Sequence, residues 1–260
     1  MTSGGPSAPL GERGATDGTA FAAVTVAPAA PAPATDDRGR AAGEEPGTQL
    51  GGPTWLLLAL LSASLGLYAG IAADVVHNGR LAEVDVDIAT WVAGSMPSWA
   101  EWLARPFTWV GGLVGATAVV VAAATWLLVR SSRAQALILL VAAGGIQLLV
   151  MTGKEGYDRP RPDVGSAIDL PSSFSFPSGH AATGIAVFGL LGLLASIYAR
   201  TRAARIAAVV AGFALGAAIG ASRVVLNVHY LSDVLAGACL GFAWLVTCIL
   251  LVRLARRLRS

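Results

Sequence analysis

Residues 206–252 read IAAVVAGFALGAAIGASRVVLNVHYLSDVLAGACLGFAWLVTCILLV. Two apolar runs, Ile206–Ser222 and Leu231–Val252, each approach the roughly 17–25 residues that a helix needs to cross the hydrocarbon core of a bilayer. The segment between them, RVVLNVHY, holds an arginine and a histidine. Ionisable groups close to a membrane are costly and usually serve a function. The stretch therefore predicts two membrane helices joined by a chemically active segment.

Four further apolar runs precede this pair. Hydrophobic residues make up 55% of the chain and charged residues only 13%, so a water-soluble globule would lack the polar surface to cover itself. Charged, proline- or glycine-containing interruptions separate the runs. We therefore predict an all-α, polytopic membrane helix bundle with six transmembrane spans. The spans are about Thr54–Val75, Thr108–Val129, Ala134–Thr152, Thr183–Ala199, Ile206–Ser222 and Leu231–Val252.

The N-terminal region differs in composition from the rest of the chain. Gly, Ala, Pro, Ser and Thr dominate residues 1–52, and no amphipathic period holds there. We predict a disordered tail at 1–52, followed by the six-span domain at 53–260. A signal peptide at Phe21–Ala34 is disfavoured, because that run is broken by prolines and lacks a basic start.

Arginines collect in three segments at helix ends, and none of these segments contains an acid. They are Arg130, Arg133, Arg200, Arg202, Arg205, Arg253, Arg256, Arg257 and Arg259. With six spans, all three segments fall on one side, which the positive-inside rule makes cytoplasmic. We expect a multi-pass cell-membrane protein with both termini in the cytoplasm. The outward segments are then 76–107, 153–182 and 223–230.

The first outward segment spaces Trp91, Trp99 and Trp102 among aliphatic residues. Indole rings prefer the interface between membrane and water. We expect an amphipathic segment lying at that interface. It is either a plain aromatic belt or a lid or ramp beside a site.

Lys154 is the only lysine in the chain and opens the second outward segment. Together with Arg161 and Arg223 it brings three cations to one side of the membrane, and an anion between them would relieve their repulsion. Arginine binds a phosphoryl group through two parallel donors, while lysine adds a compact charge. An ion-pair network with the acids of 155–163 is the alternative.

The sequence Pro-Ser-Gly-His at 177–180 predicts a helix start. Ser178 can cap the helix, and Gly179 permits close backbone approach. The free N–H groups and the positive end of the helix dipole favour an anion there. An ordinary helix cap before His180 is the alternative.

His229 and Asp233 are four residues apart and share a helix face if the last span begins there. A carboxylate that holds the proton of one imidazole nitrogen leaves the other nitrogen free as a nucleophile or base. A metal half-site or a simple cap has the same spacing.

Together, the three segments resemble the signature of the type 2 phosphatidic acid phosphatase superfamily. That family includes lipid phosphate phosphatases and, more distantly, the vanadium haloperoxidases. Its motifs are Lys, six residues, Arg-Pro; then Pro-Ser-Gly-His; then Ser-Arg, five residues, His, three residues, Asp. The matching residues are Lys154, Arg161, Pro162, Pro177, Ser178, Gly179, His180, Ser222, Arg223, His229 and Asp233, with no departure.

The resemblance implies the acid phosphatase and vanadium haloperoxidase core fold and a metal-independent lipid phosphatase without cofactors. The arginine distribution predicts that its site lies on the outer face. His229 would attack phosphorus to form a phosphohistidine, oriented by Asp233, and His180 would act as proton donor and then activate water. The expected substrate is a membrane lipid phosphate: polyprenyl diphosphate is favoured, and phosphatidylglycerophosphate and phosphatidic acid follow. The substrate-binding residues would be Lys154, Arg161, Ser178, Gly179 and Arg223.

Two alternatives stay open. The same residues would serve a phosphotransferase that passes the phosphoryl group to a lipid or sugar hydroxyl. A non-catalytic phosphate-binding membrane protein is disfavoured by the intact His229 and His180. We expect no metal ligands and no nucleic-acid partner. Arg159, in the second Arg-Pro pair, lies outside the signature spacing and is given a lesser or structural role.

Overall fold

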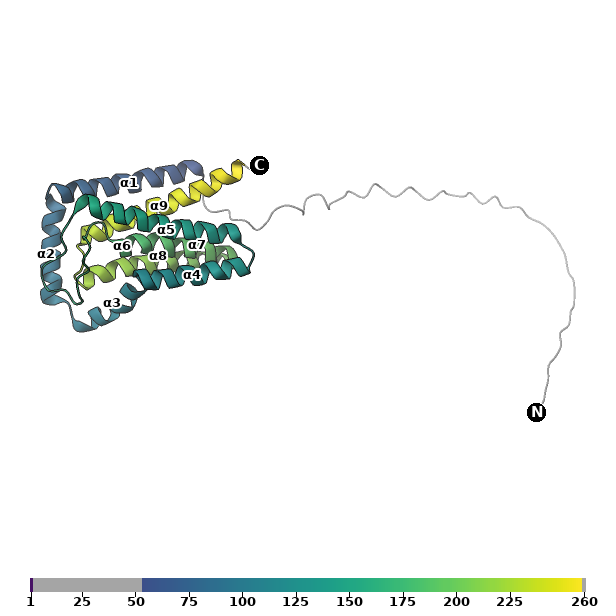
Figure 1. The fold of residues 1–260 in the computed structure, drawn as a ribbon, viewed down its shortest axis with the longest axis horizontal. Coiled ribbons are helices and arrows are strands. Elements are labelled where there is room, and N and C mark those ends of the chain that lie inside the picture. Colours follow the sequence, from purple (N-terminus) through teal and green to yellow (C-terminus); the bar gives the residue numbers. More distant parts are fainter. Residues whose placement is uncertain (2–52, 259–260) are drawn as a thin grey trace, which may run out of the picture. The chain divides into compact units, whose positions relative to one another are not determined.

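The computed structural model describes Met1 and residues 53–258, so the tail predicted at 2–52 lies outside the described residues. All regular structure within 53–258 is helical (Figure 1). The elements are α1 Thr54–Val76, α2 Arg80–Ser95, α3 Ser98–Gly111, α4 Leu113–Val129, α5 Arg133–Tyr157, α6 Gly179–Thr183, the π-helical turn η2 Gly184–Phe188, α7 Gly189–Tyr198, α8 Arg202–Val225 and α9 Leu231–Arg257.

Five helices in the described part of the chain are long and apolar enough to cross a membrane. They are α1, α5, the continuous helix formed by α6, η2 and α7, then α8 and α9. The helices α3 and α4 make a sixth candidate span when taken together, although they are bent by 55° at their junction. The predicted all-α membrane bundle is confirmed, and the second predicted span corresponds to this bent pair.

Several helix ends differ from the sequence prediction, and three of these differences lie near the predicted motifs. The span predicted from Thr108 breaks at Gly112, and the preceding Gly111 lies so close to Ile219 that a side chain there would clash. Helix α5 continues past Thr152 to Tyr157, so Lys154 lies on its last turn. The fourth span begins at Gly179, where the motif starts.

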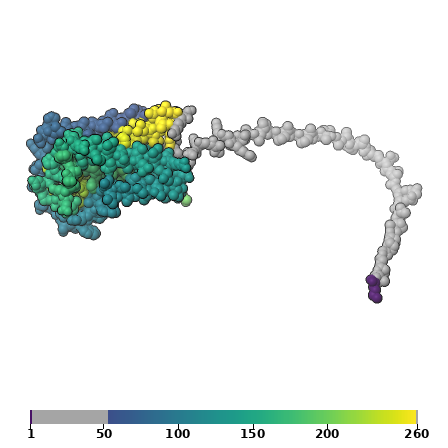
Figure 2. Space-filling model, viewed as in Figure 1, coloured from purple at the N-terminus to yellow at the C-terminus, as the bar shows by residue number. Residues whose placement is uncertain are grey.

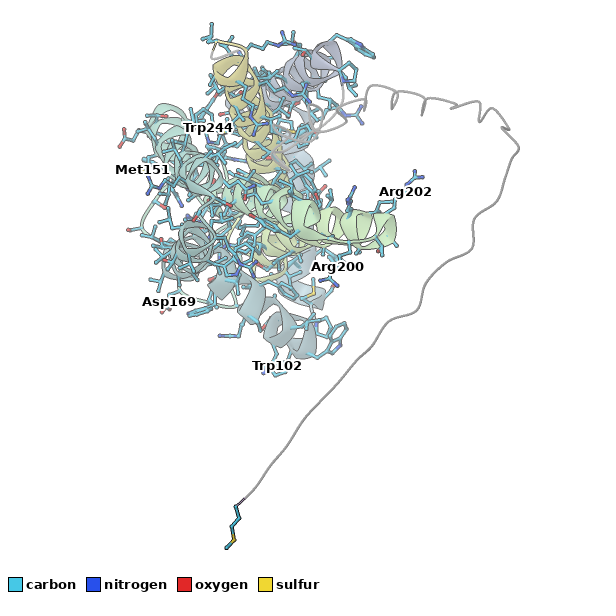
Figure 3. All side chains as sticks on the ribbon, turned by 90° about the vertical axis from the view of Figure 1, so that its right-hand side faces the viewer. Trp102, Met151, Asp169, Arg200, Arg202 and Trp244 are labelled. Carbon is cyan, nitrogen blue, oxygen red and sulfur yellow. The ribbon has the colours of Figure 1, made fainter. Side chains whose placement is uncertain are left out.

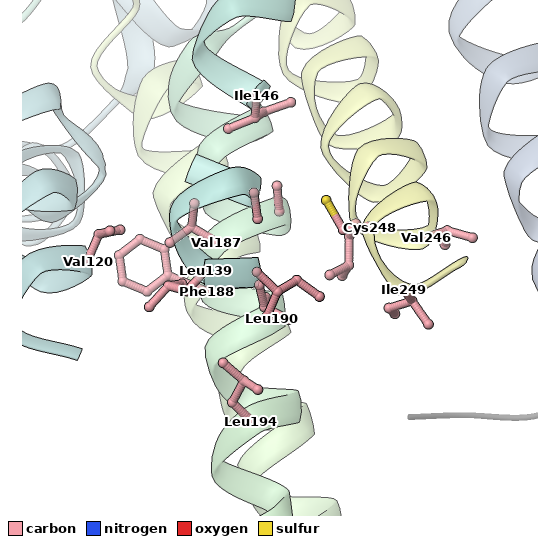
Figure 4. Packing of buried hydrophobic residues seen from close by; sticks show 14 of the residues in the cluster. Val120, Leu139, Ile146, Val187, Phe188, Leu190, Leu194, Val246, Cys248 and Ile249 are labelled. Atoms are coloured by element: carbon pink, nitrogen blue, oxygen red, sulfur yellow. The ribbon is translucent and has the colours of Figure 1, made fainter. Parts of the chain in front are cut away.

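The core of the bundle forms where α4, α5, the η2–α7 helix and α9 meet (Figure 4). Leu139 and Ile146 of α5 pack with Leu190 of α7 and are completely buried. Cys248 of α9 lies in the same cluster and acts as a packing residue. This apolar contact fixes the helices whose ends carry the motifs.

The η2–α7 helix and α8 approach unusually closely. A Cβ atom on Gly184 would stand 2.7 Å from the carbonyl oxygen of Gly216, so both positions require glycine. Membrane helices gain packing contact through such small residues. The close pair brings the start of α6 beside the end of α8.

The two ends of the bundle have different characters. Helix α2 runs across one end, and in the space-filling view α5 and the segment after it cover the neighbouring surface (Figures 1 and 2). The opposite end, which faces the viewer in Figure 3, carries Arg200 and Arg202. The first and last helices also meet there, since Arg257 donates to the Thr54 hydroxyl over 3.5 Å. The motifs and the basic turns therefore lie at opposite ends.

Candidate active site

The three predicted motifs converge at the α2 end of the bundle. Lys154 comes from the last turn of α5, Ser178 and His180 from the start of α6, and Arg223 from the last turn of α8. Lys154, Arg161 and Arg223 lie close enough to feel one another's charge. Within 53–258 none of these three cations pairs with a carboxylate. The alternative of a local ion-pair network is therefore wrong for them.

The contacts of His229 define its tautomer. Its Nε2 lies 3.1 Å from Nη1 of Arg161, and its Nδ1 lies 3.3 Å from Oδ2 of Asp233. A guanidinium only donates hydrogen bonds. Nε2 of His229 therefore carries the lone pair, and Nδ1 donates its proton to the carboxylate. This arrangement leaves Nε2 able to act as a nucleophile.

His229 is buried, with 3% of its surface exposed, and burial lowers its pKa to about 4 although Asp233 acts in the opposite direction. The imidazole is thus neutral at pH 7, as a nucleophile must be. The predicted shared helix face is not the reason for the pairing, because α9 begins only at Leu231. Instead Oδ2 of Asp233 accepts the backbone N–H of Tyr230 over 2.9 Å, which turns the carboxylate back towards His229.

Arg161 and Lys154 rest on backbone oxygens. Arg161 donates from Nε to the carbonyl of Ser173 over 2.8 Å and from Nη1 to that of Val228 over 2.6 Å. Lys154 donates to the carbonyl of Phe174. A surface cavity of about 260 Å³ opens beside Arg161, lined by residues 160–163 and 170–174. Neutral carbonyls are weaker partners for a cation than an anion is, so both side chains can rearrange around a phosphate.

Two donors in the predicted anion site have no partner. Ser178 occupies the N-cap position of α6, yet its hydroxyl makes no capping bond, contrary to the expectation from the sequence. The Ser178 Oγ and the Arg223 Nε are both buried without a hydrogen-bond partner. Such buried groups are rare and cost about 1–3 kcal/mol each. A bound oxyanion would satisfy both. Gly179 opens α6 beside them, so its N–H belongs to the first turn, which lacks helical acceptors.

Thr108, which the sequence did not single out, contacts two predicted site residues from the last turn of α3. Its carbonyl oxygen lies 3.1 Å from Nε2 of His180, and its hydroxyl accepts a hydrogen bond from Arg223. A carbonyl only accepts, so Nε2 of His180 carries a proton. His180 lies within electrostatic range of Arg223 and His229. No motif marks Thr108; only its place next to the helix break could have drawn attention to it.

Arg159 and Asp85 were also missed as site residues. Nη1 of Arg159 donates to Oδ1 of Asp233 over 2.6 Å, and its Nη2 donates to Oδ2 of Asp85 over 2.9 Å. The repeated Arg-Pro pair was a visible signal for Arg159. Asp85 lies on α2, far from any motif, and nothing in its sequence context distinguishes it from the exposed Asp87. Among residues 53–258, no three His, Cys, Asp or Glu side chains gather closely enough to hold a metal ion.

Comparison with known proteins agrees with this architecture. Residues 135–257 match the family described as the PAP2 superfamily, a range that includes every motif residue. Phosphatidylglycerophosphatase B of Bacillus subtilis (strain 168) is 27% identical over 180 residues, covering 68% of this chain and 88% of that protein.

The fold also matches a solved structure, that of a transmembrane PAP2-type phosphatidylglycerolphosphate phosphatase from Bacillus subtilis. The TM-score is 0.66 at 24% sequence identity, and the match covers 76% of this chain and 96% of that one. Residues 135–257 of this multi-pass membrane protein thus form a PAP2 superfamily domain.

Proposed function

We propose that this protein is an integral membrane lipid phosphatase that works through a phosphohistidine. The comparisons support a membrane lipid phosphatase of the PAP2 superfamily, and the contacts of His229 support the mechanism. The observation that carries the proposal is Nε2 of His229, an unprotonated imidazole nitrogen that lies 3.1 Å from Arg161 and within electrostatic range of Arg223, whose Nε has no partner. A nucleophile and a prepared set of phosphoryl ligands therefore occupy the same site.

In the first step, Nε2 of His229 attacks phosphorus, and the bond from phosphorus to the leaving oxygen breaks. With an anion bound beside it, His180 takes a second proton from solvent at Nδ1. It then gives its Nε2 proton to the leaving oxygen and remains a neutral imidazole. The proton on Nδ1 of His229 stays with Asp233, which stabilises the charge that develops on the ring.

In the second step, water attacks the phosphohistidine and the P–N bond breaks. Nε2 of His180 accepts a proton from that water, so inorganic phosphate leaves and His229 is again neutral. Lys154, Arg161 and Arg223, with Ser178 and the Gly179 N–H, hold the equatorial oxygens in both steps. Such fixed donors supply most of the catalysis in phosphoryl transfer. No step requires a metal ion.

The substrate we propose is a lipid whose phosphate or diphosphate head enters the site while its tail stays in the bilayer. Phosphatidylglycerophosphate is one candidate, because the Bacillus subtilis relative carries that activity in its name. Polyprenyl diphosphate is the other, since an outward-facing site would meet the headgroup that must be recycled on that face. The exposed Trp99, Trp102 and Trp109 of α3 suit the membrane surface beside such a site.

We also propose that the site faces outward and both ends of the helical domain face the cytoplasm. The basic turns lie at the end of the bundle opposite to the motifs, which agrees with the positive-inside rule (Figure 3). Single cysteines at Ser166 and Ser131, in a chain lacking Cys239 and Cys248, test this orientation. An impermeant thiol reagent applied to intact cells should label position 166 and spare position 131. The reverse labelling would move the reaction to the cytoplasm.

The function is tested by phosphate release from purified protein in detergent. The panel contains phosphatidylglycerophosphate, polyprenyl diphosphate, phosphatidic acid and a short soluble phosphate ester, each with and without a chelator. We expect lipid substrates to exceed the soluble ester in kcat/KM by at least about 100-fold, because each methylene held out of water contributes about 0.8 kcal/mol. Equal efficiency on the soluble ester would contradict the lipid assignment. Loss of activity in chelator, restored by magnesium, would contradict the metal-free mechanism.

A further inference from the structure

Arg159 lies between two buried carboxylates behind the catalytic pair. Its side chain is 11% exposed, while those of Asp85 and Asp233 are 2% and 0% exposed. It donates to Asp233 over 2.6 Å, to Asp85 over 2.9 Å and to the hydroxyl of Ser232 over 2.7 Å. Its guanidinium also stacks 4.3 Å from the centre of the Tyr230 ring. These contacts surround the guanidinium of Arg159 and hold it in a single position.

Asp85 anchors this arrangement to α2. Its Oδ1 accepts the backbone N–H of Ser232 over 2.9 Å, and its Oδ2 accepts the Ser232 hydroxyl as well as Arg159. Ser232 and Asp233 are neighbours in the first turn of α9. The helix that crosses the end of the bundle therefore contributes one carboxylate to the group that holds Asp233.

The charges explain why an arginine is needed here. Two carboxylates buried close together would not both stay ionised without a cation between them. Burial opposes the charge on Arg159, but Asp233 and Asp85 outweigh this effect and raise its pKa. One oxygen of Asp233 is thus occupied by Arg159, and the other is left for Nδ1 of His229.

We propose that Arg159, fixed by Asp85, is a positioning residue that sets the orientation of Asp233 and, through it, of the attacking nitrogen of His229. This inference rests on the proposed function, because it assumes that His229 performs the chemistry. It also assigns α2 a part in the reaction that no motif of the sequence contains. A simple strut between α2 and α9 would make the same contacts, so the test must separate positioning from support.

The test compares variants of the full chain in detergent by phosphate release from phosphatidylglycerophosphate and from polyprenyl diphosphate, using whichever the wild type hydrolyses. For Arg159→Gln we expect kcat to fall by about 100-fold with KM changed less than about threefold, because substrate does not touch this residue. Arg159→Lys should regain about tenfold of that loss, since an ammonium keeps the charge without the fork. Asp85→Asn should lower kcat by about tenfold, and the matched control Asp87→Asn should leave it unchanged.

A double-mutant cycle decides between positioning and support. If Arg159 acts through Asp233, then Arg159→Gln should lower kcat by less than about twofold in an Asp233→Asn background, measured over long incubations. If the loss of kcat in the double variant instead equals the product of the two single losses, the proposal is overturned. If Arg159→Gln is not recovered as a folded protein, the same cycle with the near-isosteric Asp85→Asn gives the answer. An inactive wild type would overturn the proposed function and this inference together, whereas an active wild type with an unaffected Arg159→Gln would overturn this inference alone.

Discussion

The two halves of the site differ in how completely their hydrogen bonds are satisfied. Around Asp233 each carboxylate oxygen has partners, from Arg159 on one side and from His229 and Tyr230 on the other. In the proposed phosphate-binding half, Ser178 and Arg223 keep buried donors without partners. The proposed nucleophile is therefore held in place by the protein itself, while the proposed anion site would be completed only by its ligand. Rigid support for a reacting group and unsatisfied donors for the substrate are both consistent with stabilising a transition state.

Removing the proposed nucleophile should have the largest effect. His229→Ala should lower turnover by more than about 10⁴-fold, because the covalent route is lost. In the wild type, a brief acid-free quench with labelled substrate should trap a phosphoryl-enzyme that is stable in base and labile in acid. Robust turnover by the His229→Ala protein would show that another group attacks phosphorus.

Removing a cation from the unsatisfied half should have the next largest effect. Arg223→Gln should reduce kcat/KM by about 10²–10³-fold, as expected for the loss of a charged donor to the transferring phosphoryl group. It should also weaken inhibition by vanadate, which takes the trigonal-bipyramidal place of that group. Unaltered vanadate inhibition in this variant would exclude Arg223 from the anion site.

The buried His229 should make the stability of the fold depend on pH. The pKa of His229 is about 4 in the folded protein and near 6.5 when the chain unfolds, so the unfolded chain binds more protons between these values. Stability should therefore fall as the pH drops, by about 2 kcal/mol from this residue between pH 7 and pH 5. Denaturant unfolding in detergent measures this, and His229→Gln should remove that part of the pH dependence. An equal acid sensitivity in His229→Gln would show that other groups cause it.

The smallest expected effect comes from removing the unpartnered hydroxyl of Ser178. Ser178→Ala removes a hydroxyl that has no partner, so it should leave the protein equally stable or more stable by up to about 1 kcal/mol. The same change should lower kcat by about tenfold, because one phosphoryl ligand is lost. Thr183→Ala is the contrasting variant, because its buried hydroxyl accepts a hydrogen bond from Gln147, so this change should lower stability and leave kcat unchanged. A destabilised Ser178→Ala protein with full activity would reverse the assignment of this hydroxyl.

Much of this molecule could be predicted from its sequence, for identifiable reasons. The length of a hydrophobic run indicates a membrane span directly, so the bundle and the order of its helices could be predicted from the sequence. The motifs predicted Lys154, His180 and His229 as site residues, because residue type and spacing can be read from the sequence without knowledge of tertiary contacts. The roles assigned to these residues remain predictions.

The roles of Asp85 and Thr108 could not be predicted from the sequence, because they depend on tertiary contacts. Asp85 lies on α2 and Thr108 on α3, each more than seventy residues from its partner in the site. Arg159 stands in a visible Arg-Pro pair, but the motif spacing selects Arg161, so its contacts with Asp85 and Asp233 were not predicted. The break at Gly112 was missed as well, since the apolar run continues through it.

That break also changes how thick a membrane the protein can accept. Helix α4 has 17 residues and is therefore about 25 Å long, shorter than the hydrocarbon core of about 30 Å. A bilayer that meets α4 must thin locally or receive part of the oblique α3, whose Trp102 and Trp109 are exposed. Thinning would lower the layer of lipid headgroups beside Thr108 and His180. A lipid phosphate would then reach the site with less of its tail drawn out of the membrane.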